Sequence, residues 1–154
     1  MIVSGHFNGA LRFWDLRSGK DIKELSGVHG SGVAIASIAA ASSDTGDVIS
    51  IGRNNAAAII DVRTYGVRLR LRSDHLRLSY GPVSGCFSPD GRYVAVGSSS
   101  GQTVTWRSSD GVVEKVLHGT QDLNHSSQVQ CVAWGAGGHI VTGEKNGPAI
   151  IWSS

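Results

Sequence analysis

The sequence predicts an all-β fold of short antiparallel strands, and three observations carry this prediction. No segment shows a convincing apolar period of about 3.6 residues, the mark of an amphipathic helix. Glycine is frequent, at 21 of 154 residues, and Gly, Pro or Asn/Ser clusters interrupt the chain roughly every ten residues. Short alternating strands also recur at a fixed interval, so we expect a repeat architecture in which each repeat is a small sheet.

The repeat interval is set by four matching strand ends. Trp14, Ile60, Trp106 and Trp152 each close an alternating strand, and each follows the last by 46 residues. An aspartate comes directly after the first two. Because these residues mark strand ends in a repeat, we interpret them as architectural rather than catalytic. The architectural set comprises Trp14, Asp15, Asp61, Trp106 and Trp152.

Three further kinds of strand are expected around these strand ends. A short apolar strand ending in glycine precedes each one, at 2–5, 48–52, 93–97 and 139–143. Inner strands are expected at 33–42, 83–91 and 129–138, and outer strands at 20–27, 66–73 and 111–119. A helix over the alanine-rich run is the alternative to the first inner strand. We prefer a strand because Val33, Ile35 and Ile38 are β-branched and no helix recurs at this phase of the other repeats.

Four strands in each repeat of this length are typical of a β-propeller blade, and a Trp-Asp pair closing the third strand indicates the WD-repeat type. We therefore predict one partial WD-repeat propeller over 1–154, a segment of about three and a half four-stranded antiparallel blades. The approximate blade limits are 1–27, 32–74, 82–119 and 127–154. Because the first blade lacks an inner strand and the last an outer one, we expect the chain to be a fragment of a longer protein.

Composition excludes several classes of function. A net charge of +2 is too small to indicate a nucleic-acid partner. No apolar run approaches the ~20 residues that cross a bilayer, and no signal peptide is recognisable, so we expect neither a transmembrane nor a secreted protein. Cys86 and Cys131 lie in apolar strands without a partner at metal-ligand spacing. We interpret both as reduced core thiols of a cytosolic protein, and we expect no metal and no cofactor.

The chain resembles the C-terminal half of the WD-repeat propeller of the autophagy-related protein sixteen family. The segments that carry the resemblance are, in order, "SGHFNGALRFWDLRSGK", "IIDVRT", "CFSPDGRYVAVGSSSGQTVTW", "VVEKVL", "HSSQVQCVAW" and "EKNG...IIW". SPDG and the tryptophans occur in many WD-repeat proteins, whereas "IDVRT" and "VEKVL" followed by "HSS" are more particular. The similarity runs along almost the whole chain.

This resemblance implies a non-catalytic scaffold for protein recruitment in autophagy. In that family an N-terminal segment binds the conjugation machinery, a coiled coil dimerises, and the propeller recruits. Only the recruiting role is implied for this chain, with proteins as partners, through peptide motifs or subunits. The implied location is the cytoplasm, with recruitment to the forming autophagosome membrane.

Two alternatives remain, one within binding proteins and one from a different class of protein. A generic WD-repeat adaptor, such as a substrate receptor of a ubiquitin ligase, would share the same fold and the same binding face. A propeller-type hydrolase would need a cluster of carboxylates or histidines on the channel. We expect no enzyme activity, because the chain holds no Gly-x-Ser-x-Gly, His-x-x-x-His, Cys-x-x-Cys or phosphate-loop pattern.

A protein-binding face is expected where the loops between second and third strands meet the connections into the inner strands. Exposed aromatic and arginine side chains in these loops are the expected anchors, because such residues dominate interface hot spots. The residues predicted to bind there are His6, Phe7, Asn8, Arg53, Asn54, His75, Arg77, Tyr80, Lys145 and Asn146, with Ser99 and His125 beside them.

Two histidines and one basic strand have structural as well as functional interpretations. His29 and His125 each precede a strand by four residues, where many WD repeats place a structural histidine, although binding or pH sensing is the alternative. The aspartate that usually accompanies this structural histidine in a WD repeat is replaced here by Asn8, Asn54, Ser100 or Asn146. Arginines alternate with leucines over 68–72, as on an outer strand with one solvated face. The functional alternative is a strip that contacts acidic peptides or, weakly, anionic lipid headgroups.

Overall fold

The protein is described by a computed structural model over residues 1–42, 45–119 and 124–153, and these residues form fourteen β-strands and no helix. In chain order the strands are β1 (Ile2–Gly5), β2 (Leu11–Trp14), β3 (Asp21–Leu25), β4 (Ile35–Ala40), β5 (Asp47–Gly52), β6 (Ala56–Asp61), β7 (Gly66–Leu71), β8 (Gly85–Phe87), β9 (Tyr93–Gly97), β10 (Thr103–Arg107), β11 (Val113–Leu117), β12 (Val129–Trp134), β13 (Ile140–Glu144) and β14 (Ala149–Trp152). The all-β prediction is confirmed. The alanine-rich run forms β4, so the helical alternative is wrong.

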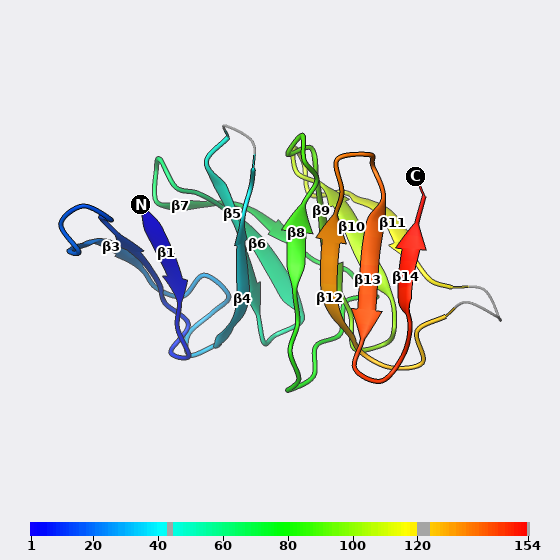
Figure 1. Ribbon diagram of the computed structural model, residues 1–154. Coiled ribbons are helices and arrows are strands. Elements are labelled where there is room, and N and C mark those ends of the chain that lie inside the picture. Colours follow the sequence, from blue (N-terminus) through cyan, green and yellow to red (C-terminus); the bar gives the residue numbers. More distant parts are fainter. Residues whose placement is uncertain (43–44, 120–123, 154) are drawn as a thin grey trace.

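The strands form four antiparallel sheets, which we call blades. Blade 1 is β1-β2-β3, blade 2 is β4-β5-β6-β7, blade 3 is β8-β9-β10-β11 and blade 4 is β12-β13-β14. Figure 1 shows the blades side by side in a row, from blade 1 at the left to blade 4 at the right, with β4, β8 and β12 as successive inner strands. This arrangement confirms the predicted propeller segment, in which the first and last blades have three strands and the two between them have four. The blade limits as domain boundaries stay a prediction.

A β-bulge marks the repeat in each of the first three blades. The register shifts between β2 and β3 next to Trp14, between β6 and β7 next to Ile60, and between β10 and β11 next to Trp106. These residues are among those that set the repeat interval. A bulge adds one residue to a strand and increases its local twist. Each outer strand therefore turns away from its blade at the same point of the repeat.

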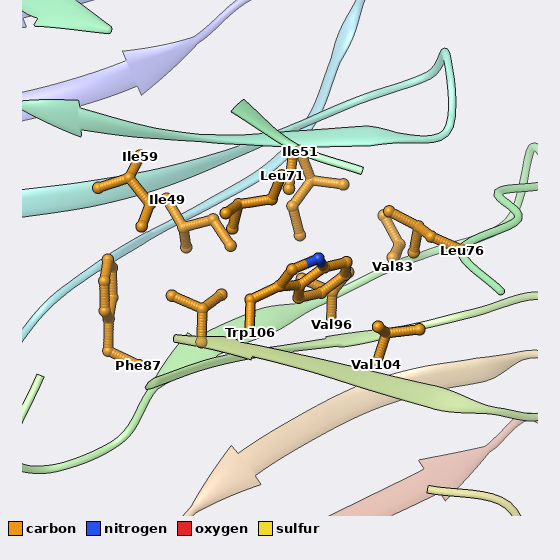
Figure 2. Close-up of a cluster of buried hydrophobic side chains, with 12 residues drawn as sticks. Ile49, Ile51, Ile59, Leu71, Leu76, Val83, Phe87, Val96, Val104 and Trp106 are labelled. Atoms are coloured by element: carbon orange, nitrogen blue, oxygen red, sulfur yellow. The ribbon is translucent and has the colours of Figure 1, made fainter. Parts of the chain in front are cut away.

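The largest hydrophobic cluster lies between blades 2 and 3. Trp106 is completely buried there, and in Figure 2 its indole ring lies at the centre of the cluster, facing Leu71 and Ile51 of blade 2. Phe87 and Val96 of blade 3 close the sides. Burying a large aromatic or aliphatic side chain is worth about 1.5–3 kcal/mol, so this interface holds much of the stabilising apolar area.

The other two interfaces differ in completeness. Between blades 1 and 2, Leu11 and Phe13 are fully buried, and Tyr65 packs edge-on against Phe13 with ring centroids 5.0 Å apart. Between blades 3 and 4 the buried cluster of the described residues is small, with Ala95, Val129, Val132 and Ile140, and Trp134 and Trp152 are partly buried around it. The packing thus becomes less complete toward blade 4.

The glycine that ends each second strand lies where a neighbouring segment passes close by. A Cβ on Gly5 would meet Ile35 Cγ2 at 2.5 Å, and a Cβ on Gly52 would meet the His29 ring at 2.3 Å. Real Cβ atoms are not found this close to other heavy atoms. The periodic glycines are therefore a packing requirement at the point where the inner strand begins.

The prediction that both cysteines are core thiols is wrong for Cys131. Cys86 is half-buried against blade 4, and burial raises the pKa of its thiol to about 11. Cys131 is exposed, because it lies on the side of blade 4 that faces away from blade 3, as do the exposed Val141 and Ile151. Both thiols are free. Within the described residues no helix is long and apolar enough to cross a bilayer.

Candidate protein-binding face

The residues predicted to bind proteins all lie in turns or connections along one side of the row of blades. We call this side the loop face, and it comprises the turns at 6–10, 53–55, 98–102 and 145–148 with the connections at 26–34, 72–84 and 124–128. It runs along the lower side of Figure 1. The structure therefore brings residues from four blades to one surface, while their role in binding stays a prediction.

Two aromatic side chains protrude from the loop face. Phe7 is 90% exposed and Tyr80 is fully exposed, at 102%. Large aromatic side chains are costly to leave in water and are enriched in binding hot spots. Arg77 and Lys145, both exposed, add positive charge to the same side. The predicted anchors are thus available to a partner.

The segment Ser79–Pro82, which carries Tyr80, is held from both neighbouring blades. From blade 2, Arg53 Nη1 donates to the carbonyl oxygens of Ser79 and, at 3.0 Å, of Gly81. From the blade 4 side, Gln128 Nε2 donates to the Pro82 carbonyl, and the Ser79 hydroxyl donates to Gln128 Oε1. Backbone fixed on both sides of a protruding side chain loses little further conformational entropy on binding.

This geometry changes the role expected for Arg53. Its guanidinium was predicted to contact a partner, but the side chain is half-buried and bonds two carbonyl groups of the Tyr80 segment. Arg53 therefore holds the backbone of the Tyr80 segment, and its contact with a partner stays a prediction. Gln128 was missed by sequence reasoning, although it lies 46 residues after Pro82, the repeat interval itself.

Ser98 fixes the backbone around His75 and Arg77. The Ser98 hydroxyl donates to the His75 carbonyl at 2.8 Å, and the Arg77 N–H donates to Ser98 Oγ at 2.9 Å. The Ser99 N–H donates to the Arg77 carbonyl at 2.7 Å. The exposed side chains of His75 and Arg77 thus project from a backbone that is anchored to the β9–β10 turn.

Hydrogen-bond relays inside the blades explain the architectural tryptophans and histidines. In blade 1, Trp14 Nε1 donates to Ser4 Oγ at 2.8 Å, and Ser4 Oγ lies 2.9 Å from His6 Nε2. His6, predicted as a binding residue, is therefore half-buried and partly committed to this relay. In blade 4, Trp152 Nε1 donates to Thr142 Oγ1 at 2.8 Å, and His125 Nε2 lies 2.7 Å from the same oxygen.

The remaining two blades keep parts of this relay. In blade 2 the buried His29 places Nε2 3.0 Å from Ser50 Oγ, and Asn54 Nδ2 donates to the His29 carbonyl at 2.7 Å. In blade 3 Trp106 Nε1 instead donates to the Arg72 carbonyl at 3.3 Å. The hydroxyls of Ser4, Ser50 and Thr142 fall on the repeat interval, and Val96 takes that place in blade 3. This periodic hydroxyl is the signal that sequence reasoning missed.

Burial favours the neutral form of two histidines, His29 and His125, and lowers the pKa of each. Desolvation, aided by the positive charge of Arg70, lowers the pKa of His29 to about 4. Burial also lowers the pKa of His125, and the carboxylate of Glu144 opposes this shift. The Glu144 carboxylate accepts hydrogen bonds from the Ser127 N–H and hydroxyl, each at 2.7 Å, and these lower its own pKa. These histidines are structural parts of the blades near neutral pH.

The aspartates of the architectural set close turns. Asp15 accepts hydrogen bonds from the Arg17 N–H at 2.9 Å and the Ser18 hydroxyl at 2.8 Å, and these lower the pKa of its carboxyl. Asp61 accepts from the Arg63 side chain and N–H, which lowers its pKa in the same way. Carboxylates used for local backbone contacts are typical of turns rather than of catalysis.

At the turn positions where many WD repeats carry an aspartate, this chain has asparagine or serine, and these side chains make local contacts or are exposed. Asn8 Oδ1 accepts the Ala10 N–H at 3.2 Å, and Ser100 Oγ lies 2.9 Å from Ser98 Oγ. Asn146 is exposed beside Lys145 in the β13–β14 turn. The contacts of Asn8 and Ser100 are local to their turns and form no buried charged network, as expected from the loss of the carboxylate.

The alternating arginines of β7 connect blades. Arg68 Nη2 lies 2.7 Å from Asp47 Oδ2, and Arg68 Nη1 donates to the Ser108 carbonyl of blade 3 at 2.8 Å. Arg70 Nη1 donates to the Val28 carbonyl on the side of blade 1. These contacts favour the structural interpretation of the strand over a free strip for acidic peptides or lipids. Within residues 1–42, 45–119 and 124–153 no three metal-ligating side chains converge.

Comparison with known proteins gives the relationship. No family model matches the sequence. The chain is 33% identical over 153 residues to Autophagy-related protein 16 of Arabidopsis thaliana. The matched region covers 99% of this chain and 28% of that protein. The chain is homologous to a segment of autophagy-related protein 16.

Two further relatives agree with this result. Protein tipD of Dictyostelium discoideum is 31% identical over 152 residues, covering 98% of this chain and 24% of that protein. Protein Atg16l2 of Mus musculus is 31% identical over 153 residues, covering 99% of this chain and 23% of that protein. The chain thus spans about a quarter of the length of the curated relatives it matches.

Proposed function

We propose that this chain is a non-catalytic scaffold that recruits proteins to the autophagy machinery through its loop face. The observation that carries the proposal is the Tyr80 segment, whose backbone is held by Arg53 and Gln128 while the tyrosine ring is fully exposed. The ring buries no area in the free protein, so its whole apolar surface is available to a partner. Names of the relatives supply the autophagy context.

The proposed partner is a protein, and the proposed location is the cytoplasm with recruitment to the forming autophagosome membrane. Exposed aromatic rings on rigid backbone give large contact area at low entropic cost. The positive charges of Arg77 and Lys145 would steer acidic surfaces toward them. Contact with anionic lipid is a weaker part of the proposal, since Arg68 and Arg70 already bond to neighbouring blades.

The test compares matched variants of the complete protein in cells that lack their own copy. Tyr80→Ala and Phe7→Ala remove the protruding rings, and Leu16→Ala is the control, because Leu16 is 70% exposed in the β2–β3 turn on the other side. Bound proteins are quantified by affinity purification, and autophagic turnover of a reporter is measured in parallel. We expect Tyr80→Ala to reduce at least one partner about tenfold and to slow turnover, as loss of a hot spot does.

Arg53→Ala separates positioning from contact. This variant keeps the Tyr80 side chain but removes both hydrogen bonds from Arg53 to the backbone of the Tyr80 segment. We therefore expect a smaller reduction in partner binding than for Tyr80→Ala. Unchanged binding and turnover in Tyr80→Ala, Phe7→Ala and their double variant would contradict the proposed function. A loss equal to theirs in Leu16→Ala would contradict the assignment of the loop face.

A further inference from the structure

A groove lies between blades 3 and 4 on the side of the row opposite the loop face, which is the upper side of Figure 1. Its walls are the β8–β9 turn with Tyr93 and the β12–β13 turn with Trp134, and its volume is about 270 Å³. These walls come from the first and second strands of the two blades, and none of the lining residues belongs to β14. The groove is therefore built from the inner parts of two neighbouring blades.

The corresponding place between blades 2 and 3 is closed. Phe87 of β8 pairs with Val94. Trp134 of β12 pairs with Ile140, which follows Val94 by the repeat interval. Phe87 and Trp134 thus hold the same place in their blades. Phe87 is only 6% exposed, whereas Trp134 is half-buried.

A difference in charged residues accompanies this difference in burial. Asp47 precedes Tyr93 by the repeat interval, and its carboxylate lies 2.7 Å from Arg68 Nη2. The same arginine donates to the Ser108 carbonyl of blade 3 and so joins the two blades. One repeat later the aspartate is replaced by Tyr93 and the arginine by Glu114. An aromatic ring and a carboxylate cannot form this ion pair, so the next interface lacks the bridging arginine.

Two hydrogen-bond donors of the groove are unused. Within residues 1–42, 45–119 and 124–153 the indole N–H of Trp134 has no acceptor, whereas the other three tryptophans donate theirs. The Tyr93 hydroxyl has no partner in this part of the chain either. The two rings stack, with centroids 6.0 Å apart and an interplanar angle of 23°. Buried tryptophan and tyrosine usually find a partner for the polar group, so this stacked pair suits a ligand that supplies acceptors.

The charges at the rim of the groove are already paired. Asp90 Oδ2 lies 2.6 Å from Arg92 Nε, and the Arg92 guanidinium lies over the Tyr93 ring, 5.9 Å from its centroid. The β8–β9 turn also uses its backbone internally, because the Ser88 N–H donates to the Tyr93 carbonyl and the Gly91 N–H to the Ser88 carbonyl. An occupant therefore needs no charge of its own, and this turn offers it no edge for strand pairing.

We infer that this groove binds an uncharged, proline-rich segment of another protein in the polyproline II conformation. The polyproline II backbone makes no internal hydrogen bonds, so its carbonyl groups can accept from the Trp134 N–H and the Tyr93 hydroxyl. Proline has no N–H and so requires no acceptor from the groove. Grooves lined with aromatic side chains are a recurring means of recognising such segments.

Other conformations of a bound segment fit the groove less well. A helix uses its own carbonyl groups in internal hydrogen bonds and would leave both donors unused. A β-strand binds by pairing with a sheet edge, which the β8–β9 turn does not provide. The inference is independent of the loop face, because the groove lies on the opposite side of the blades.

The test uses the full chain and fluorescently labelled decaproline, which adopts polyproline II without a partner. Fluorescence anisotropy measures binding, and hydrogen exchange locates it. We expect saturable one-to-one binding and slowed exchange of amides within 88–93 and 134–138, with amides within 77–82 unchanged. A Gly-Ser peptide of equal length is the control. We expect it to bind at least about tenfold more weakly, because it is flexible and carries no rings.

Variants of the chain test the two donors. Tyr93→Phe and Trp134→Phe each keep an aromatic ring in the groove and remove one polar hydrogen. We expect each to weaken decaproline binding about fivefold, as loss of one hydrogen bond does, and the double variant to weaken it about twentyfold. Tyr80→Phe is the matched control, because it removes the hydroxyl of a fully exposed tyrosine on the loop face. We expect its affinity for decaproline to be unchanged.

Three results would overturn the inference. One is the absence of saturable decaproline binding, or binding without slowed exchange in the two turns. Another is equal binding of the Gly-Ser peptide. The third is unchanged affinity in both Tyr93→Phe and Trp134→Phe, or an equal loss in Tyr80→Phe, which would assign the proline contact to the loop face. Thermal melts check that each variant is folded, and the two single variants decide if the double variant is not.

Discussion

Trp106 and Trp152 occupy the same position of successive repeats and are held in opposite ways. Trp106 is fully buried between blades 2 and 3, and its Nε1 reaches only a backbone carbonyl at 3.3 Å. Trp152 is half-buried against blade 3, and its Nε1 donates to Thr142, which also bonds His125. Val96 replaces the hydroxyl where packing is complete. Apolar burial and a polar relay are thus alternative solutions for one position of the blade.

The largest expected effect separates the two tryptophans directly. Replacing a fully buried tryptophan by alanine costs about 3–5 kcal/mol, so we expect Trp106→Ala to lower the free energy of unfolding by this amount. Trp152→Ala should cost less than half as much, because part of its ring is already in water. Urea denaturation followed by circular dichroism measures both. Equal losses would break the comparison.

Acidification tests the histidine relays. The folded pKa of His29 is about 4, below the usual value of the unfolded chain, so the unfolded state binds the extra proton between about pH 6.5 and 4. Stability should therefore fall as the pH falls through this window, by about 2–3 kcal/mol. Denaturant unfolding at several pH values measures this slope.

The matched variants place the slope in one blade. His29→Gln should remove most of the pH dependence, whatever it does to stability at pH 7. His125→Gln should remove less, because the Glu144 carboxylate opposes the lowering of the His125 pKa. A steeper contribution from His125 than from His29 would show that burial differs from this description.

The smallest expected effects concern two threonines. Thr142→Val removes the oxygen shared by Trp152 and His125 and leaves buried polar groups without a partner, which costs about 1–3 kcal/mol. Thr103 is also buried, but its hydroxyl has no hydrogen-bond partner within the described residues. Thr103→Val should therefore be neutral or stabilising, by up to about 1 kcal/mol. Thermal melts of the two variants should shift in opposite directions or differ clearly in size.

Much of this fold could be predicted from the sequence because its information is periodic. The constant interval located the third strand of each repeat, which ends near Trp14, Ile60, Trp106 or Trp152. A glycine located the second strand of each repeat. The exposure of Cys131 could not be predicted, because an alternating strand does not reveal which of its faces a neighbouring blade covers.

The candidate site was only partly predictable for a similar reason. Loop positions placed Phe7 and Tyr80 on one face, since loops between matching strands emerge on the same side of each blade. The contacts of Arg53 and Gln128 with the Tyr80 segment join residues 26 or more positions apart, and no local pattern signals such contacts. Side-chain partners across blades need the packed structure.

The glycines that end the second strands bear on how such a repeat can diverge. At Gly97 a Cβ would lie 2.7 Å from the carbonyl oxygen of Val129, the first residue of the next inner strand, β12. The obstacle is space, so polarity, charge and helix or strand preference of the incoming residue are irrelevant. A blade can replace its tryptophan by isoleucine, or lose its aspartate, through a single substitution. Replacing the glycine also requires a compensating shift of the next inner strand. A saturation mutagenesis map would therefore show Gly52 and Gly97 intolerant of every substitution, alanine included.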